Sequence, residues 1–109
     1  MASVVRNNAA RHRYELSDGE EVVAIEDYDV RGENIALVHT EVFAGHEGKG
    51  YARTLVEEVL ADVRAQGLGV LPECPYVRKV IAEHPADYLD LVPSAVRAKF
   101  RLPAASSAE

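Results

Sequence analysis

The sequence has 109 residues, enough for a single domain built around one hydrophobic core. Its formal net charge of -6 argues against a nucleic-acid-binding surface and against an anionic membrane face, because both need a dense cluster of Lys and Arg. No apolar segment approaches the roughly 20 residues that a membrane-spanning helix needs.

The first third of the sequence predicts antiparallel strands. Residues 1–11 show no clear period, and we expect a loosely held terminus that adds part of a strand at most. Residues 12–17 and 21–30 predict two strands joined by a Ser-Asp-Gly hairpin turn. Tyr14 and Leu16 share one side of the first of these strands.

Residues 34–43 predict a central strand. Strict alternation sorts its side chains into two faces: Ile35, Leu37, His39, Glu41 and Phe43 on one, and Ala36, Val38, Thr40 and Val42 on the other. Both sets are rich in apolar residues, so we expect the strand to be buried on both sides for most of its length.

An amphipathic helix follows a glycine-bearing turn. Its apolar positions recur at helical spacing: Ala52, Leu55, Val56, Val59, Leu60 and Val63. Gly67 stands just past the last turn, where glycine commonly ends a helix. The short apolar run at residues 68–72 then predicts another strand.

Pro75 suits the first position of a second helix, which Pro85 ends. Its expected inner stripe is Tyr76, Val77, Val80, Ile81 and His84. Short turns or a helix follow, and residues 101–109 are expected to be a disordered tail beyond a single domain at residues 1–100. These elements predict an α+β fold, a mostly antiparallel twisted sheet covered by two or three helices.

The turn before the first helix has the features of an anion site. Gly48 and Gly50 lie between a strand and a helix start, where backbone N–H groups and the positive end of the helix dipole converge. The alternative is that both are simply turn glycines. A nucleotide P-loop is excluded because the Gly-Lys-Ser/Thr ending is absent.

At this loop the sequence resembles a known family. Residues 47–52, followed by Leu55, are similar to the pyrophosphate-binding signature of GCN5-related N-acetyltransferases (Gln/Arg, two residues, Gly, one residue, Gly/Ala). Residues 39–42, 72–77 and 84–85 resemble, in the same order, a small single-domain YjdJ-type subgroup. The resemblance covers about three quarters of the chain and implies a minimal fold of that family.

The resemblance implies acetyl-CoA, and thus coenzyme A, as the cofactor. The backbone of the strand end would pair with the pantetheine arm, and the loop amides would hold the pyrophosphate. The implied cofactor-binding residues are Thr40, Glu41, Val42, Gly48, Lys49, Gly50, Tyr51, Ala52, Cys74 and Tyr76. Glu47 stands where the family has Gln or Arg. Its carboxylate near a phosphate costs on the order of 1 kcal/mol, which Lys49 or Arg53 could offset, so we expect weakened binding.

Two residues are candidates for the chemistry. Cys74 precedes the second helix, whose dipole favours the thiolate form although Glu73 opposes it, and the resemblance places it near the acetyl group. The alternative is a buried, inert cysteine. His39 is a candidate general base for the amine, with Glu41 to orient or replace it. The alternative is a half-buried strand histidine satisfied by a backbone carbonyl.

We therefore expect an acetyl-CoA-dependent N-acetyltransferase whose amine acceptor is a small molecule or a protein lysine. Direct attack by the amine is the simplest route, and transfer through Cys74 is the alternative. A CoA-binding or protein-interaction module with little catalysis is the rival function. The scattered histidines and single cysteine predict no metal site. The absence of a signal-peptide pattern at the first residues predicts a cytoplasmic protein.

Overall fold

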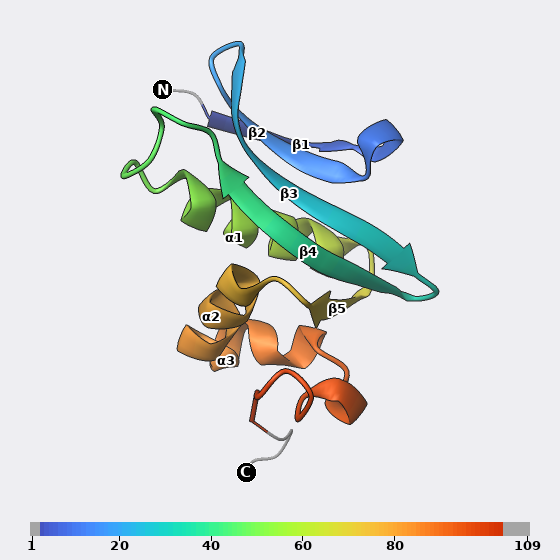
Figure 1. The fold of residues 1–109 in the computed structure, drawn as a ribbon. Helices are drawn as coiled ribbons and strands as arrows, with labels where there is room; N and C mark the ends of the chain where they lie inside the picture. Colours follow the sequence, from blue (N-terminus) through green and yellow to red (C-terminus); the bar gives the residue numbers. More distant parts are fainter. Residues whose placement is uncertain (1–2, 104–109) are drawn as a thin grey trace.

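A computed structural model describes residues 3–103 as a five-stranded sheet with helices packed against it (Figure 1). In chain order the strands and α-helices are β1 (Ser3–Asn8), β2 (Arg13–Asp18), β3 (Glu21–Arg31), β4 (Asn34–Val42), α1 (Tyr51–Ala65), β5 (Gly69–Pro72), α2 (Pro75–Glu83) and α3 (Pro85–Tyr88). Single 3-10 turns occupy Ala9–Arg11, Leu89–Leu91 and Ser94–Val96.

The sheet is mixed, in the spatial order β1-β2-β3-β4-β5. The first four strands are antiparallel, and β5 pairs with β4 in parallel after the α1 crossover. This arrangement confirms the predicted α+β fold with a mostly antiparallel sheet.

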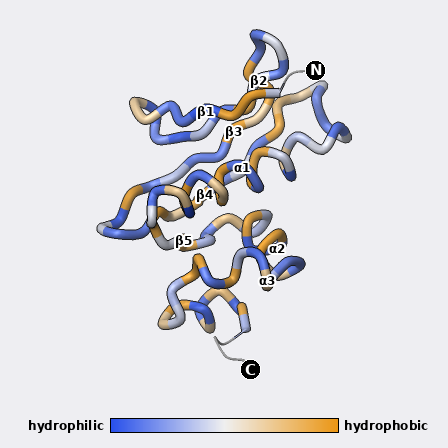
Figure 2. The backbone as a smooth tube through the Cα atoms, turned by 180° about the vertical axis from the view of Figure 1, so that it is seen from behind, coloured by the Kyte–Doolittle hydropathy of each residue, from blue (hydrophilic) through white to orange (hydrophobic). Residues whose placement is uncertain are grey.

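The core lies between the sheet and the helices. The buried side chains of α1 are all apolar: Leu55, Val56, Val59, Leu60 and Val63. They belong to one cluster with buried residues of β2, β3, β4, β5 and α2. Figure 2 colours each residue by hydropathy: hydrophobic residues, in orange, recur along α1, and the turn between β3 and β4 is hydrophilic, in blue. The Tyr14 hydroxyl also donates to the Asp62 carboxylate at 2.6 Å, which ties β2 to α1.

A β-bulge in β4 overturns the strict alternation predicted for that strand. Asp27 pairs with His39 and the next β3 residue pairs with Leu37, which leaves Val38 as an extra residue. The extra residue shifts the faces by one position. Leu37 therefore shares the core-facing side with Thr40, whereas His39 turns to the opposite side.

The prediction that β4 is buried on both sides for most of its length is also wrong. Only Ile35, Ala36 and Leu37 are buried, and Val38 is 41% exposed. The reason is the length of β5, whose four residues pair only with Asn34–Leu37. Beyond that point β4 still pairs with β3 on one side, but on its other side no strand of the described part of the chain pairs with it. We call residues 38–42 the open edge.

The structure differs from three further expectations, which concern the N-terminal segment, the C-terminal boundary and His84. The N-terminal segment forms a full strand, β1, rather than part of one. Leu102 is 7% exposed and packs into the core, so the packed chain continues beyond the predicted boundary at residue 100. Residues 104–109 of the expected tail lie outside the described residues. His84 is exposed instead of packed, because the chain has left the helix there and adopts φ -135° and ψ 60°.

Candidate functional site

The open edge of β4 presents unpaired backbone groups. The amide of Phe43 donates to the Val23 carbonyl at 2.9 Å, so Phe43 faces β3. Backbone groups of successive strand residues point to opposite edges, so the N–H and C=O groups of Thr40 and Val42 face away from β3. An extended ligand laid along this edge would meet donors and acceptors spaced as in a β-ladder.

The loop between β4 and α1 gathers further free amides. Gly48 and Gly50 have φ values of 81° and 78°, in the left-handed region that favours glycine. Gly50 is the N-cap of α1 and offers no side chain to cap the helix. The amides of the first helical turn therefore have no intrahelical partner and point out of the helix end. A Cβ atom added at Gly48 or Gly50 would meet no other atom within 4 Å, so the space beside both glycines is open.

A small pocket of about 180 Å³ lies at this corner. It is lined by Val42, His46, Glu47, Gly48, Gly50, Tyr51, Ala52, Arg53 and Tyr76. It thus brings together six of the predicted cofactor-binding residues from β4, the loop, α1 and α2. The predicted residues Thr40, Glu41, Lys49 and Cys74 do not line it. Its volume is below the roughly 300 Å³ at which ligand pockets usually begin, so a ligand the size of CoA would extend beyond it.

Charges beside the pocket are partly engaged with one another. The carboxylate of Glu47 accepts a hydrogen bond from the Gly45 amide at 3.0 Å. Arg53 donates to Glu57 at 2.8 Å and lies 2.6 Å from the His84 ring nitrogen. The hydrogen bond to Glu57 raises the pKa of Arg53, which stays cationic. The pocket wall therefore carries one positive side chain, Arg53, and one negative side chain, Glu47.

Cys74 lies between the open edge and α2. It is the N-cap residue of α2, and its side chain is 3% exposed. Its amide donates to the Leu37 carbonyl at 2.8 Å, just where β4 loses its pairing with β5. Its Sγ lies 3.1 Å from the Thr40 hydroxyl oxygen. The thiol is therefore held against the first part of the open edge.

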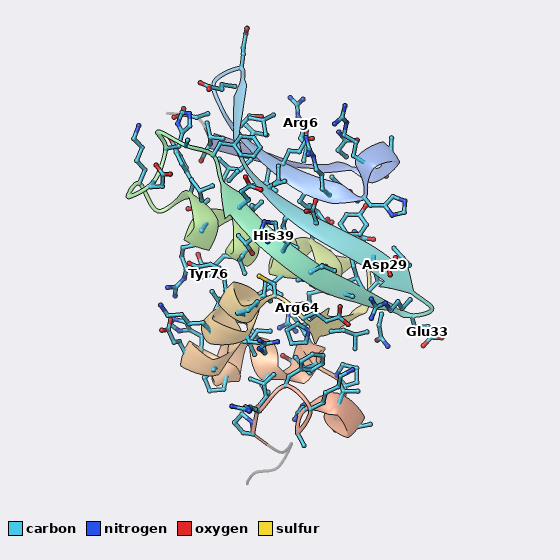
Figure 3. The ribbon with its side chains drawn as sticks, viewed as in Figure 1. Arg6, Asp29, Glu33, His39, Arg64 and Tyr76 are labelled. Atoms are coloured by element: carbon cyan, nitrogen blue, oxygen red, sulfur yellow. The ribbon has the colours of Figure 1, made fainter. Side chains whose placement is uncertain are left out.

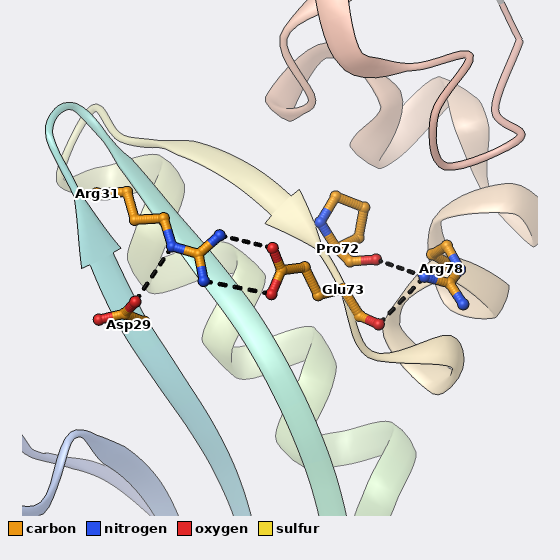
Figure 4. A network of polar contacts seen from close by, with 5 residues as sticks. All are labelled: Asp29, Arg31, Pro72, Glu73 and Arg78. Atoms are coloured by element: carbon orange, nitrogen blue, oxygen red, sulfur yellow. Dashed lines mark hydrogen bonds and ion pairs between the residues drawn. The ribbon is translucent and has the colours of Figure 1, made fainter.

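A polar network fixes the chain immediately before Cys74 (Figure 4). Arg31 forms a fork with Glu73, with its Nη1 2.6 Å from Oε2, and also bonds Asp29 at 3.1 Å. On the other side, Nη1 of Arg78 donates to the carbonyls of Pro72 and Glu73 at 3.2 and 3.1 Å. The connection between β5 and α2 is thereby held through the Glu73 side chain and through the backbone carbonyls of Pro72 and Glu73. These contacts limit the positions that the thiol of the next residue can occupy.

Sequence reasoning missed Glu26, which lies in β3 opposite Thr40. Its side chain is fully buried, and it accepts a short hydrogen bond from the Thr40 hydroxyl. Burial raises the pKa of Glu26 to about 8, with a further increase from Asp27, while hydrogen bonds from Thr40 and the His39 backbone oppose the shift. A signal was present in the sequence, because alternation puts Glu26 on the same face as Ala24 and Tyr28.

His39 and Glu41 project from the other side of β4. Their side chains are about half exposed, and His39 Nε2 lies 3.4 Å from the Glu41 carboxylate. The histidine and the thiol are therefore not brought together: His39 belongs to the open edge, whereas Cys74 belongs to the start of α2 and contacts the edge through Thr40. Figure 3 shows His39 on β4 and Tyr76 on α2.

Other features of the surface lie away from these residues. A pocket of about 510 Å³ lies between α2 and residues 99–102, and none of the predicted site residues lines it. Within residues 3–103 no cluster of three or more His, Cys, Asp or Glu could hold a metal ion. None of the described helices is long and apolar enough to cross a membrane.

Comparison with known proteins supplies the family. Searching the curated proteins gave no match. Among solved structures, the chain is similar to the ribosomal-protein-S18-alanine N-acetyltransferase of Escherichia coli, with 18% identity and a TM-score of 0.51. That likeness covers 59% of this chain and 43% of the other, and it supports the fold. The family model described as GCN5-related N-acetyl-transferase matches residues 13–91. On that match, the chain belongs to the GCN5-related N-acetyltransferase family.

Proposed function

We propose that this protein transfers an acetyl group from acetyl-CoA to an amine. The observation that carries the proposal is the continuity of the open edge of β4 with the glycine loop at the start of α1. The edge offers an extended hydrogen-bonding surface, and the loop offers converging amides for an anion. Coenzyme A has both parts, an arm with amide groups and a diphosphate.

Each end of the cofactor has its own set of residues in this proposal. The backbone at Thr40–Val42 pairs with the pantetheine arm, and the amides of Gly48–Ala52 hold the diphosphate. Tyr76 and Tyr51 form walls of the pocket beside the loop. Lys49 is exposed and supplies positive charge from outside the pocket. This order brings the thioester to the part of the edge where Cys74 lies.

The amine reaches the thioester from the face of β4 that carries His39 and Glu41. Both side chains are accessible there, and a neutral histidine beside a carboxylate can accept a proton from an ammonium group. Either a small amine or a protein lysine fits this description. The reaction needs a compartment that supplies acetyl-CoA, and we place it in the cytoplasm.

A module that binds CoA without turnover is the second candidate function. Glu47 favours it, because a carboxylate in the pocket wall opposes a diphosphate. The two functions differ in one measurement. Incubation with acetyl-CoA and a mixture of amines releases free CoA thiol only if the protein is an acetyltransferase.

Binding is tested first by thermal unfolding with coenzyme A. A ligand at about 100 times its Kd stabilises the folded state by roughly 2.7 kcal/mol, which raises Tm by on the order of 10 °C in a chain of this size. Gly48→Ala should lose most of this shift, because φ at Gly48 is 81° and the loop must distort. Gly32→Ala is the matched control, since φ at Gly32 is 63° in a turn remote from the loop. Equal shifts in both variants, or none in the native protein at millimolar CoA, would contradict the proposal.

Replacing Glu47 by Gln is expected to tighten CoA binding about fivefold. The substitution removes a negative charge that opposes the diphosphate by about 1 kcal/mol, and the amide oxygen can still accept from Gly45. Isothermal titration with CoA measures the change, and Glu58→Gln, on the exposed side of α1, serves as the control. Weaker binding in Glu47→Gln would mean that the carboxylate is needed to shape the loop.

A further inference from the structure

A buried carboxylate lies behind the open edge. The Glu26 side chain is 0% exposed, and one of its two oxygens, Oε2, has no hydrogen-bond partner. No cation pairs with it among the described ion pairs. An unpaired buried carboxyl is costly, and an apolar side chain of similar size would fit the core more cheaply. Buried ionisable groups with a perturbed pKa cluster at functional sites, so the position of Glu26 behind the open edge points to a role there.

Its neighbours form a chain of three polar groups. The Thr40 hydroxyl donates to the Glu26 carboxylate, and the Thr40 oxygen is itself 3.1 Å from Cys74 Sγ. The three residues come from β3, β4 and the N-cap of α2, so the fold alone brings them together. A hydroxyl that donates on one side can accept an S–H on the other, so a proton can pass along the chain in one concerted shift.

We propose that Glu26, acting through Thr40, receives the thiol proton of Cys74 and so prepares this cysteine to accept the acetyl group. This proposal rests on the proposed function and assigns Glu26 and Thr40 as positioning residues for it. The reactive form of a cysteine is its thiolate, and no cation in the described part of the chain pairs with the thiol to stabilise one. The carboxylate supplies the missing proton acceptor.

The chemical step balances without any further reactant. The Cys74 proton moves to Thr40 as the Thr40 proton moves to Glu26, and the sulfur attacks the thioester carbonyl carbon. A new C–S bond forms, the bond from that carbon to the CoA sulfur breaks, and the CoA thiolate leaves. The proton held on Glu26 passes back to Thr40, and the Thr40 hydroxyl gives its own proton to the departing CoA sulfur, since acetylated Cys74 has no proton to relay. The products are acetyl-Cys74 and free CoA, and the amine then takes the acetyl group and leaves its proton on Cys74.

The surroundings of Glu26 set the pH at which the carboxylate can accept a proton. Asp27 on its own strand is a nearby like charge, Tyr14 lies opposite on β2, and Cys74 is the titratable group from α2. The side chains that α1 buries against the sheet are all apolar. Burial without a cation keeps the proton on Glu26 at neutral pH. Acetylation of Cys74 should therefore rise with pH as this carboxyl ionises.

The experiment measures formation of acetyl-Cys74 from acetyl-CoA, without an amine, by intact-mass spectrometry across a range of pH. Glu26→Gln should slow the reaction at least tenfold at the highest pH and should lose the pH dependence assigned to the carboxyl. Thr40→Val should slow it by a similar factor. Thr40→Ser, which keeps the hydroxyl, should recover most of the rate that Thr40→Val loses.

The outcomes separate this proposal from the proposed function. If CoA raises Tm but Glu26→Gln and Thr40→Val acetylate Cys74 as fast as the native protein, the relay is overturned and the cofactor site stands. If the native protein binds CoA and never carries an acetyl group on Cys74, the relay is likewise overturned. Absence of any CoA-induced Tm shift instead overturns the proposed function. Valine matches the shape of threonine and serine keeps its hydroxyl, so thermal unfolding of each variant without ligand checks that a rate difference does not come from loss of folding.

Discussion

Raising the pH from about 5 to about 9 is expected to lower the free energy of unfolding by on the order of 4 kcal/mol through Glu26 alone. Its pKa is about 8 in the folded protein, against an ordinary value of 4.5. Between these two values the folded state keeps a proton that the unfolded state releases. The stabilisation is therefore complete below pH 4.5, declines across the interval, and is lost above pH 8. Chemical denaturation at several pH values measures it.

Glu26→Gln should remove most of this pH dependence, because the amide stays neutral throughout. The carboxyls with lowered pKa, Glu15 and Asp90, act in the opposite direction, and their stabilisation is lost as the pH falls below about 4.5. Neither group therefore contributes to the change in unfolding free energy expected between about pH 5 and about pH 9. Glu20→Gln in the exposed β2–β3 turn is the control and should follow the native protein. A native protein equally stable at both ends of the range would contradict the burial of an unpaired carboxylate.

Replacing Cys74 by Ala is expected to reduce acetyl transfer by about 10² to 10⁴, the usual range for losing a group that takes part in proton or acyl transfer. The variant keeps the backbone bond from residue 74 to Leu37, so CoA binding should weaken by less than about tenfold. CoA release in the presence of amines measures turnover, and the CoA-induced Tm shift measures binding.

The same variant decides between the two routes for the acetyl group. Undiminished turnover in Cys74→Ala would favour direct attack by an amine bound with acetyl-CoA, with His39 as the base on the exposed face. In that case His39→Ala should lose turnover, with the loss smallest at high pH, where the ammonium group of the acceptor loses its proton to solvent without a base from the protein. Cys74→Ser is a useful companion, because it fills the space of the thiol and still contacts Thr40.

Much of the fold was predictable because its patterns are local. The apolar spacing from Leu55 to Val63 specifies α1, and Pro75 specifies the start of α2. Gly48 and Gly50 mark a turn that a side chain would strain. At the start of α1, the resemblance of the motif to a known family named ten residues, of which the fold gathers six around one pocket.

Other features depend on which strand lies beside which, and periodicity carries no information about that. The bulge at Val38 reverses the faces of β4, which is why His39 and Leu37 were wrongly placed together. His84 was expected in the core because the helical period was extended one residue beyond the helix. Glu26 was overlooked because a single acidic residue in a strand usually faces water.

The sequence by itself determined the strands, the amphipathic helix, the glycine loop and the chemical types available at its ends, since each follows from spacing along the chain. Only the tertiary structure decided that β5 stops after four residues and leaves β4 an open edge, and that Glu26, Thr40 and Cys74 meet behind it. The physical reason is that pairing, register and burial are set by contacts between distant segments. The pKa of Glu26 is raised because segments from several parts of the chain bury its carboxyl group.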